Sequence, residues 1–433
     1  MAAETLTLDP DALRGLRVPR LSGYTWSVVT RPPLGESRIL VWMCILIGIN
    51  QLGFGSVVPV LPLYAQSFGV SQAAIGVSIA IYGLARFLVA VPVGQVSDRL
   101  GRRPALALGG LVTAAGNLLC AYAPNYPTFV GARFVAGVGA AFVVTAGQIV
   151  LADITTPAVR GRAMAIYQAS FLFAVGVGPL PGGVLAERFG LSAPFVAYAV
   201  TGTLVGLVAW LQVPETMALR SRGAAESGSP APPFAAQLRV LAGRIEFLLV
   251  SLVSFASAFT RTGALFNVIP ILGQDRLQLS PDRIGFALAL GSLAGFGIAY
   301  PAGVLVDRFG RKIVIVPATL LSSASLLLFL RAPSYSWFLA ASLVWSVAQG
   351  VGGAAPAAYA ADAAPPRMNA AAMSLYRTLA DSGYVVGPIV LGLVTDAFGI
   401  EMALAAGAGL LAGVGVLFAW RAPETYGRTR GAP

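Results

Sequence analysis

The sequence of 433 residues contains no histidine, one lysine (Lys312) and two cysteines. Without histidine there is no histidine-based metal site and no histidine proton relay. No Gly-x4-Gly-Lys-Ser/Thr segment is present, so the chain lacks the P-loop that binds ATP. Cys44 and Cys120 both fall inside apolar runs, where thiols pack as small hydrophobic groups rather than form a structural disulfide. We therefore expect neither an enzyme nor a cofactor.

Charged residues are scarce as well. They make up 11% of the chain, against about a quarter of a soluble protein, and hydrophobic residues make up 57%. The apolar residues form runs long enough to cross a hydrocarbon core of about 30 Å as helices, and the runs lack the alternation of a β-barrel. Twelve membrane-spanning helices are predicted, at 39–64, 75–97, 104–123, 127–151, 163–186, 192–213, 245–272, 284–306, 313–331, 335–360, 371–394 and 400–421.

The chain also contains an internal repeat. The segment Gly94–Arg103 recurs as Gly303–Lys312, 209 residues later, and both copies read Gly-x3-Asp-Arg-x-Gly-Arg followed by a basic residue. A duplicated membrane module is typical of carriers whose halves rock around a central site. The same offset relates Gly76 to Gly285, Asp153 to Asp362, Gly178-Pro179 to Gly387-Pro388, and Pro214-Glu215-Thr216 to Pro423-Glu424-Thr425.

The net charge of +11 is distributed unevenly. With the N-terminus inside, 21 of the 29 Lys and Arg residues fall in cytoplasmic segments, and the outside loops hold four. This is the positive-inside pattern, and it predicts that both termini are cytoplasmic. Membrane orientation and contact with anionic lipid account for the charge, so no nucleic acid is expected as a partner. The four outside residues are Arg188, Arg276, Arg283 and Arg331.

Composition divides the chain into five parts. Residues 1–38 lack a contiguous apolar core and are expected to be a cytoplasmic leader rather than a cleavable signal. Residues 39–216 and 245–426 are the two predicted six-helix bundles. Between them, 217–244 is rich in Pro, Gly and Ser and is predicted to be a flexible cytoplasmic linker, and 427–433 is a short tail.

The repeated motif resembles the signature loop of the major facilitator superfamily, between its second and third helices. The resemblance implies an all-α membrane protein of twelve helices in two pseudo-symmetric bundles. It also implies a monomer in the plasma (bacterial inner) membrane. In that family the loop is a latch that holds the cytoplasmic side closed, a role that falls here to Asp98 with Arg102 or Arg103. The alternative is a basic turn that only sets topology. The motif residues are Gly94, Asp98, Arg99, Gly101, Arg102 and Arg103, with Asp307, Arg308, Gly310 and Arg311 in the second copy.

Two further segments carry the resemblance. Arg133, in Gly131-Ala-Arg-Phe-Val-Ala-Gly137, matches the family arginine associated with proton coupling; its alternative is snorkelling to the membrane interface. A second segment is similar to the antiporter signature, although Gly387-Pro388-x3-Gly392 has a related pattern and a simple packing seam would explain both. Its residues are Gly178, Pro179, Gly182 and Gly183.

Ionisable side chains at membrane depth are candidates for substrate binding and coupling, because each is costly there without a cavity or a partner. They are Arg86, Arg261, Arg377 and Asp381, besides Arg133. Arg377 and Asp381 are four residues apart on one helical face and can neutralise each other. Arginine cannot be deprotonated, so Asp381 is the candidate proton carrier.

Uncharged polar groups at similar depth either contact the ligand or join helices. They are Asn50, Gln51, Gln168 and Gln349. The excess of arginine over acid favours a neutral or anionic, partly aromatic substrate. The function expected is secondary active transport, as proton-coupled efflux of a small organic molecule by alternating access. Uptake or facilitated transport of an organic anion is the alternative, and a non-transporting receptor or scaffold is a remote one.

Overall fold

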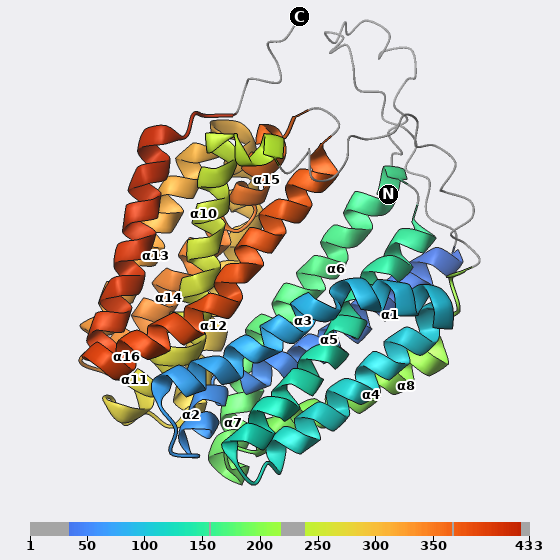
Figure 1. Cartoon of the computed structure of the whole chain (residues 1–433), viewed down its shortest axis with the longest axis horizontal. Helices are drawn as coiled ribbons and strands as arrows, with labels where there is room; N and C mark the ends of the chain where they lie inside the picture. Colours follow the sequence, from blue (N-terminus) through green and yellow to red (C-terminus); the bar gives the residue numbers. More distant parts are fainter. Residues whose placement is uncertain (1–33, 156, 218–238, 366–367, 426–433) are drawn as a thin grey trace, which may run out of the picture.

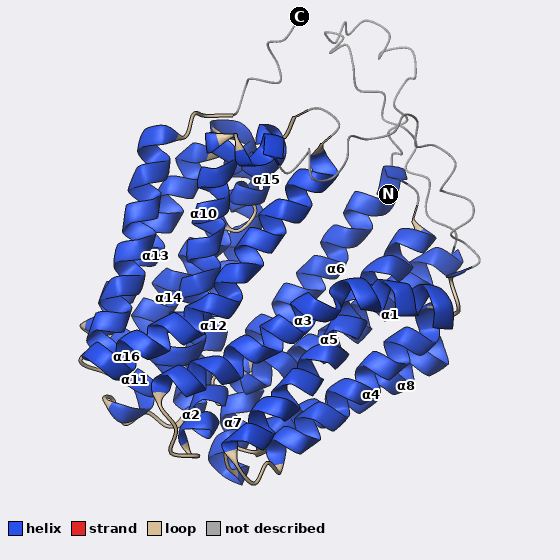
Figure 2. Ribbon diagram, viewed as in Figure 1, coloured by secondary structure: helices blue, strands red, loops and turns tan. Residues whose placement is uncertain are grey.

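The computed structural model describes residues 34–155, 157–217, 239–365 and 368–425. Within these ranges the regular structure is entirely helical (Figure 2). The predicted tail and most of the predicted leader and linker lie outside the described residues.

In the described part of the first half the helices are, in order, α1 (Leu34–Val57), α2 (Leu61–Gln66), α3 (Gln72–Leu100), α4 (Arg102–Ala121), α5 (Tyr126–Ile154), α6 (Pro157–Val177), α7 (Pro179–Phe189) and α8 (Ala193–Gln212). The second half contains α10 (Ile245–Thr260), the π-helical η3 (Arg261–Val268), α11 (Ile269–Asp275), α12 (Pro281–Phe309), α13 (Lys312–Leu330), α14 (Tyr335–Gly352), α15 (Ala355–Ala363) and α16 (Asn369–Arg421).

These helices account for the twelve predicted spans. In the described residues, eleven helical stretches are long and apolar enough to cross a membrane. The last stretch, Ala371–Arg421, holds two spans, because Gly399 has φ 86° and ψ 167° and interrupts the helix. The membrane fold is thus all-α with twelve spans.

Several spans are not single helices. The first predicted span divides at residues 58–60 between α1 and α2, because Pro59 lacks the N–H that would continue the ladder. The fifth span divides before Pro179, and the tenth divides ahead of Pro356. In the seventh span, η3 precedes Pro270, and its wider turns place Arg261 at the junction with α10.

The two halves form separate bundles. Helices α1 to α8 lie on one side and α10 to α16 on the other (Figure 1). We call the end with the turns at Gly101 and Gly310 the motif end, and the end with the turns at Gly69, Gly190 and Gly399 the distal end. The bundles approach each other near α2, α7 and α11 and diverge toward the motif end (Figure 1).

Glycines allow the backbones of the two bundles to touch in the distal half. Gly76 of α3 lies against the Pro388 carbonyl of α16, and Gly285 of α12 lies against the Pro179 carbonyl of α7. These two contacts are related by the 209-residue repeat. A side chain at either glycine would overlap a backbone carbonyl, so close packing here requires glycine.

The antiporter-like motif belongs to this seam. Gly178 and Gly182 pack against Gly55 and Ser56 of α1, within the first bundle. Gly183 packs against Pro281 at the start of α12, in the second bundle. The motif therefore serves as a packing seam both within and between the bundles.

Replacing Gly285 by Leu should open the distal end, because overpacking a close backbone contact costs about 1–3 kcal/mol. Spin labels at the exposed residues Arg188 and Arg331, in a background with Cys44 and Cys120 changed to Ala, would report the separation of the bundles. We expect a shift to longer distances.

Gly297→Leu is the matched control on the same helix, since a Cβ at Gly297 meets no atom within 4 Å. An unchanged distance distribution in a folded Gly285→Leu protein would show that the seam does not hold the distal end closed.

Candidate functional site

The second bundle contains a polar cavity of about 260 Å³. It lies among α10, η3, α13, α14 and α16, and both polar and apolar side chains line it. The apolar part includes Val253, Ile315 and Leu411. The polar part comprises Ser254, Ser257, Arg261, Thr319, Ser322, Gln349, Tyr376, Asp381 and Tyr384. Two predicted cavity residues, Arg261 and Gln349, and the predicted proton carrier Asp381 thus share one cavity.

Gln349 holds the guanidinium of Arg261. Arg261 Nη2 donates to Gln349 Oε1 at 2.6 Å, and Ser257 Oγ donates to the same oxygen at 3.1 Å. Gln349 Nε2 donates in turn to Ser322 Oγ at 3.1 Å. This chain fixes the orientation of the amide and so of the guanidinium, but it supplies no negative charge. Among the described residues, no carboxylate lies within ion-pair distance of Arg261.

Asp381 lies in the field of two arginines. Arg377, one turn earlier on α16, and Arg86 of α3 both interact electrostatically with it. Neither is within 4 Å of its carboxylate, so the three charges share a region without a direct ion pair between described residues. Asp381 and Arg377 are exposed, and Arg86 is partly buried. A carboxylate in this position is open to the cavity and remains sensitive to which charges surround it.

The charge of Arg133 is balanced by an aromatic ring and a backbone carbonyl rather than by a carboxylate. Its side chain is 1% exposed, its guanidinium carbon lies 4.5 Å from the Tyr82 ring centre, and its Nε donates to the Ser78 carbonyl at 3.3 Å. The Tyr82 and Tyr198 hydroxyls are 3.2 Å apart. Among the described residues, Nη1 of Arg133 has no hydrogen-bond partner. The position is buried in the first bundle, so snorkelling to an interface does not describe it.

A void of about 10 Å³ separates Arg133 from the second bundle. Phe54, Ile79, Phe266 and Tyr384 are among its other lining residues. The volume is about that of a single water. Tyr384 lines both this void and the larger cavity, and it interacts electrostatically with Arg86, Arg133 and Arg261.

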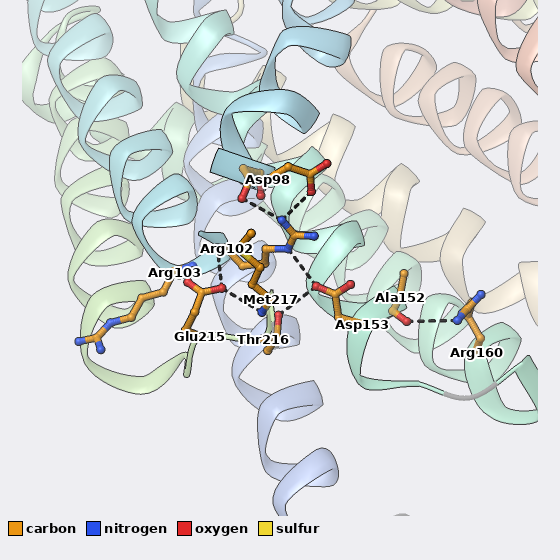
Figure 3. Close-up of polar contacts among 10 residues, drawn as sticks. Asp98, Arg102, Arg103, Ala152, Asp153, Arg160, Glu215, Thr216 and Met217 are labelled. Atoms are coloured by element: carbon orange, nitrogen blue, oxygen red, sulfur yellow. Dashed lines mark hydrogen bonds and ion pairs between the residues drawn. The ribbon is translucent and has the colours of Figure 1, made fainter. Parts of the chain in front are cut away.

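The repeated motif builds a polar cluster at the motif end (Figure 3). Arg102 is 1% exposed; its Nη1 donates to Asp98 Oδ1 at 2.7 Å and its Nε donates to Asp153 Oδ2 at 2.9 Å. Thr216 Oγ1 donates to the same Asp153 oxygen at 3.2 Å. Of the two predicted partners of Asp98, Arg102 makes the contact, and Arg103 lies over the Trp210 ring instead.

Glu215 completes the cluster by capping α4. Its Oε1 accepts from the Arg102 amide at 2.9 Å and its Oε2 accepts from the Arg103 amide at 3.2 Å. Burial raises the pKa of Glu215, but the amides of Arg102, Met217 and Arg103 and the charge of Arg102 outweigh burial, and the pKa lies below its usual range. The cap therefore stabilises the fold above the ordinary carboxyl pKa and is lost as pH falls through the lowered one.

The second half repeats this arrangement. Arg311 Nε donates to Asp362 Oδ2 at 3.1 Å, and Thr425 Oγ1 donates to the same oxygen at 3.2 Å. Glu424 accepts from the amides of Arg311 and Lys312, each at 3.0 Å. The turns at Gly101 and Gly310 have φ 98° and 107°, which explains the repeated glycine. Arg99 and Arg308 are exposed, and the Asp307 side chain lies outside the described part.

At the distal end a carboxylate joins the two bundles. Asp396 of α16 accepts from the Gln72 and Ala73 amides at the start of α3, both at 2.8 Å. The negative charge lies at the positive end of the α3 dipole. Gln66 Nε2 also donates to Asp275 Oδ2 across the bundles at 3.1 Å. Between described residues, the hydrogen bonds that join the bundles are all at this end.

The remaining residues predicted for the cavity do not line it; they are Arg86, Arg377, Asn50, Gln51 and Gln168. Asn50 and Gln51 are buried in α1, where Asn50 Nδ2 donates to Gln51 Oε1 at 2.8 Å. Gln168 is exposed on α6. Tyr376, Tyr384 and Ser257 line the cavity and were missed, because single aromatic and hydroxyl residues in an apolar span show no distinctive pattern. Glu215 and Asp396 were also missed, although the repeat of Pro-Glu-Thr was a usable signal for Glu215.

Comparisons with known proteins agree with this architecture. The Major Facilitator Superfamily model matches residues 43–277 and 250–433. Multidrug resistance protein 1 of Bacillus subtilis is 26% identical over 385 residues, which cover 87% of this chain and 94% of that protein. Tetracycline resistance protein, class C, of Escherichia coli is 32% identical over 286 residues, or 62% of this chain and 67% of that protein.

Solved structures share the fold. The inward-facing, unoccupied structure of a bacterial homologue of the human lysosomal transporter Spinster has a TM-score of 0.69 and 18% identity. That match covers 88% of this chain and 94% of the other. The human organic anion transporter MFSD10 has a TM-score of 0.62 and 22% identity, over 89% of this chain and all of that chain. At these identities the likeness concerns the fold.

Asp153→Asn should destabilise the protein by about 3 kcal/mol, because it leaves the buried Arg102 charge partly uncompensated. Asp362→Asn, its counterpart in the repeat, should cost about 1 kcal/mol or less, because the Arg311–Asp362 pair is more exposed to solvent. The side chains of Asp153 and Asp362 are 7% and 27% exposed. Unfolding of both purified variants in one detergent measures the difference; equal losses would contradict the argument from burial.

Asp396→Asn should weaken the distal contact by about 0.3–1 kcal/mol, the usual value of a charge at a helix terminus. The ratio of molecules closed at the distal end to molecules open there should then fall about twofold to fivefold, as measured with the Arg188 and Arg331 spin labels. Glu187→Gln is the control at the corresponding position of the repeat, where no hydrogen bond or ion pair joins Glu187 to another described residue. A shift of equal size in both variants would show that general surface charge, not the α3 terminus, is responsible.

Proposed function

The chain belongs to the major facilitator superfamily and is a membrane transporter rather than an enzyme, and on that premise we propose a proton-coupled antiporter that exports a small organic molecule. One observation carries the proposal: the Asp381 carboxylate lines a polar cavity inside the second bundle and lies in the field of Arg86 and Arg377. A titratable acid among fixed positive charges can couple proton binding to occupancy of the cavity.

Alternating access is supported by where the bundles touch. Their glycine contacts and hydrogen bonds lie toward the distal end, while the repeated motif occupies the other end. We take the motif end as cytoplasmic, following the positive-inside pattern, so this conformation faces inward. The Asp98–Arg102–Asp153 cluster is then positioned to act as the cytoplasmic latch when the bundles rock together at that end.

Proton exchange follows from the charge balance at Asp381. When the carboxylate is ionised, it attracts Arg86 of the other bundle; when it is protonated, that attraction is lost, so proton binding can favour a different arrangement of the two bundles. Antiport then requires that the carrier loaded with substrate and the carrier loaded with a proton cross the membrane in opposite directions. Arg133, buried beside Tyr82 and linked to this region through Tyr384, contributes a fixed positive charge.

The export direction is supported by two features. The relatives are named as multidrug and tetracycline resistance proteins, and export is the way in which a membrane transporter can provide resistance. In addition, the segment Gly178-Pro179-x2-Gly182-Gly183 is similar to the antiporter signature and forms part of the seam between the bundles.

Asp381→Asn should abolish transport driven by a pH gradient while keeping substrate binding and exchange, because asparagine cannot carry the proton. The assay uses proteoliposomes and the best transported of a panel of anionic, neutral and cationic aromatic probes. An antiporter accumulates the probe when the lumen is acidic, whereas a proton symporter accumulates it when the outside is acidic. We expect at least a tenfold loss of accumulation.

Glu401→Gln is the control, because Glu401 is an exposed distal carboxylate 3.6 Å from Arg276. Uphill accumulation that survives in Asp381→Asn would remove Asp381 from the coupling step. Accumulation that requires an acidic outside would replace export by uptake.

A further inference from the structure

Arg261 is a cavity arginine without an anionic partner among the described residues. Its one hydrogen bond there runs from Nη2 to the uncharged amide of Gln349. A guanidinium carries five N–H donors, so most of its donors remain unused. The guanidinium nitrogens that make no hydrogen bond keep some accessible surface. Because Arg261 lines the cavity, we take these unused donors to face the cavity.

The nearest carboxylate in the cavity does not resolve this imbalance. Asp381 interacts electrostatically with Arg377 and Arg86, and among the described residues no ion pair joins it to Arg261. Together with the buried Arg133, the described membrane-depth side chains carry four positive charges and one negative charge. A low-dielectric site with such an excess attracts an anion from solution.

The rest of the cavity indicates what the anion is attached to. Tyr376 and Tyr384 offer aromatic faces, and Val253, Ile315 and Leu411 offer apolar surface. Tyr376 is held in place by its hydroxyl, 2.7 Å from Ser254 Oγ. These groups suit a flat apolar body about the size of a fused ring system.

We propose that the transported substrate is an organic anion whose carboxylate binds Arg261, with Gln349 as the residue that positions the guanidinium. The planar fork of arginine matches a carboxylate in two parallel hydrogen bonds, which an ammonium cannot do. The inference deepens the proposed antiport function and depends on it. It distinguishes this cavity from one built around an acid to receive cationic drugs.

The charge of the substrate has a measurable electrical consequence. If one proton enters for each substrate exported, an anion moves two positive charges inward per cycle, a neutral molecule moves one and a cation moves none. An interior-negative potential of about 100 mV multiplies the attainable gradient about 50-fold for each charge. The anion gradient should therefore respond to voltage by about 2,500-fold, and the neutral one by about 50-fold.

Three probes of one shape test the inference: 1-naphthoate, 1-naphthamide and 1-naphthylmethylamine. Calorimetry on the full-length protein in detergent should show naphthoate binding at least tenfold more tightly than the other two. Arg261→Gln should remove this preference. Arg261→Lys should restore part of it, because it returns the charge without the fork. Arg331→Gln makes the same charge change at the distal end and should leave the preference intact.

The inference is overturned if Arg261→Gln binds naphthoate with unchanged affinity. It is also overturned if the wild-type protein shows no preference for naphthoate or binds none of the three probes. Voltage dependence in wild-type proteoliposomes is a second measurement that needs no variant. Equal voltage dependence for naphthoate and naphthamide also overturns it, because the acid would then cross in its neutral form. If naphthamide is exchanged for protons but naphthoate is not preferred, the antiport function stands and the carboxylate inference fails. If naphthoate binds through Arg261 but no protons are exchanged, the carboxylate site stands and the antiport function fails.

Discussion

The cost of a positive charge in an apolar bundle is the constraint on which this structure depends. Each arginine at or near membrane depth must find a carboxylate, a dipole, an aromatic face or a ligand. Arg102 finds two carboxylates, Arg133 finds the face of Tyr82, and Arg261 finds the amide of Gln349. The three solutions correspond to three places: a polar cluster at the motif end, the packed interior of the first bundle, and the wall of a cavity. An arginine paired with carboxylates thus belongs to the scaffold, whereas the uncompensated arginine in the cavity wall is the one that a ligand could bind.

Duplication provides the frame within which these charges differ. The Arg102 and Arg311 clusters follow the same pattern of carboxylate, threonine and helix cap. At the motif end, the helices within each bundle are therefore joined to one another in the same manner. The interior is not duplicated in this way. The 260 Å³ cavity lies entirely within the second bundle, and the void beside Arg133, where the two bundles meet, is only about 10 Å³. The halves share a scaffold and have diverged in what they enclose.

The spans, the repeat and the seam residues could be predicted because each depends on hydropathy or on fixed spacing. The breaks at Pro59 and before Pro179 follow from proline chemistry. Side-chain contacts between helices far apart in the chain could not be predicted from the sequence. Arg102 and Arg103 are neighbours in sequence but point in different directions on α4: Arg102 meets Asp98 and Asp153, and Arg103 meets Trp210. The positions of Asp153 and Trp210 depend on how other helices pack against α4. The bond from Arg261 to Gln349 likewise depends on the packing of two helices 88 residues apart.

One difference between the two copies bears on how the molecule moves. Helix α3 begins with two amides, of Gln72 and Ala73, that Asp396 grips. Helix α12 begins with Pro281, which has no amide hydrogen, followed by the acidic Asp282. At the α12 start, Glu187, the counterpart of Asp396, therefore has no matching pair of amide donors, and an acidic residue stands there instead. Between described residues the distal contact is therefore asymmetric: hydrogen bonds join α3 to α16, whereas backbone packing without such bonds joins α7 to α12, so opening has to break more interactions on the α3–α16 side.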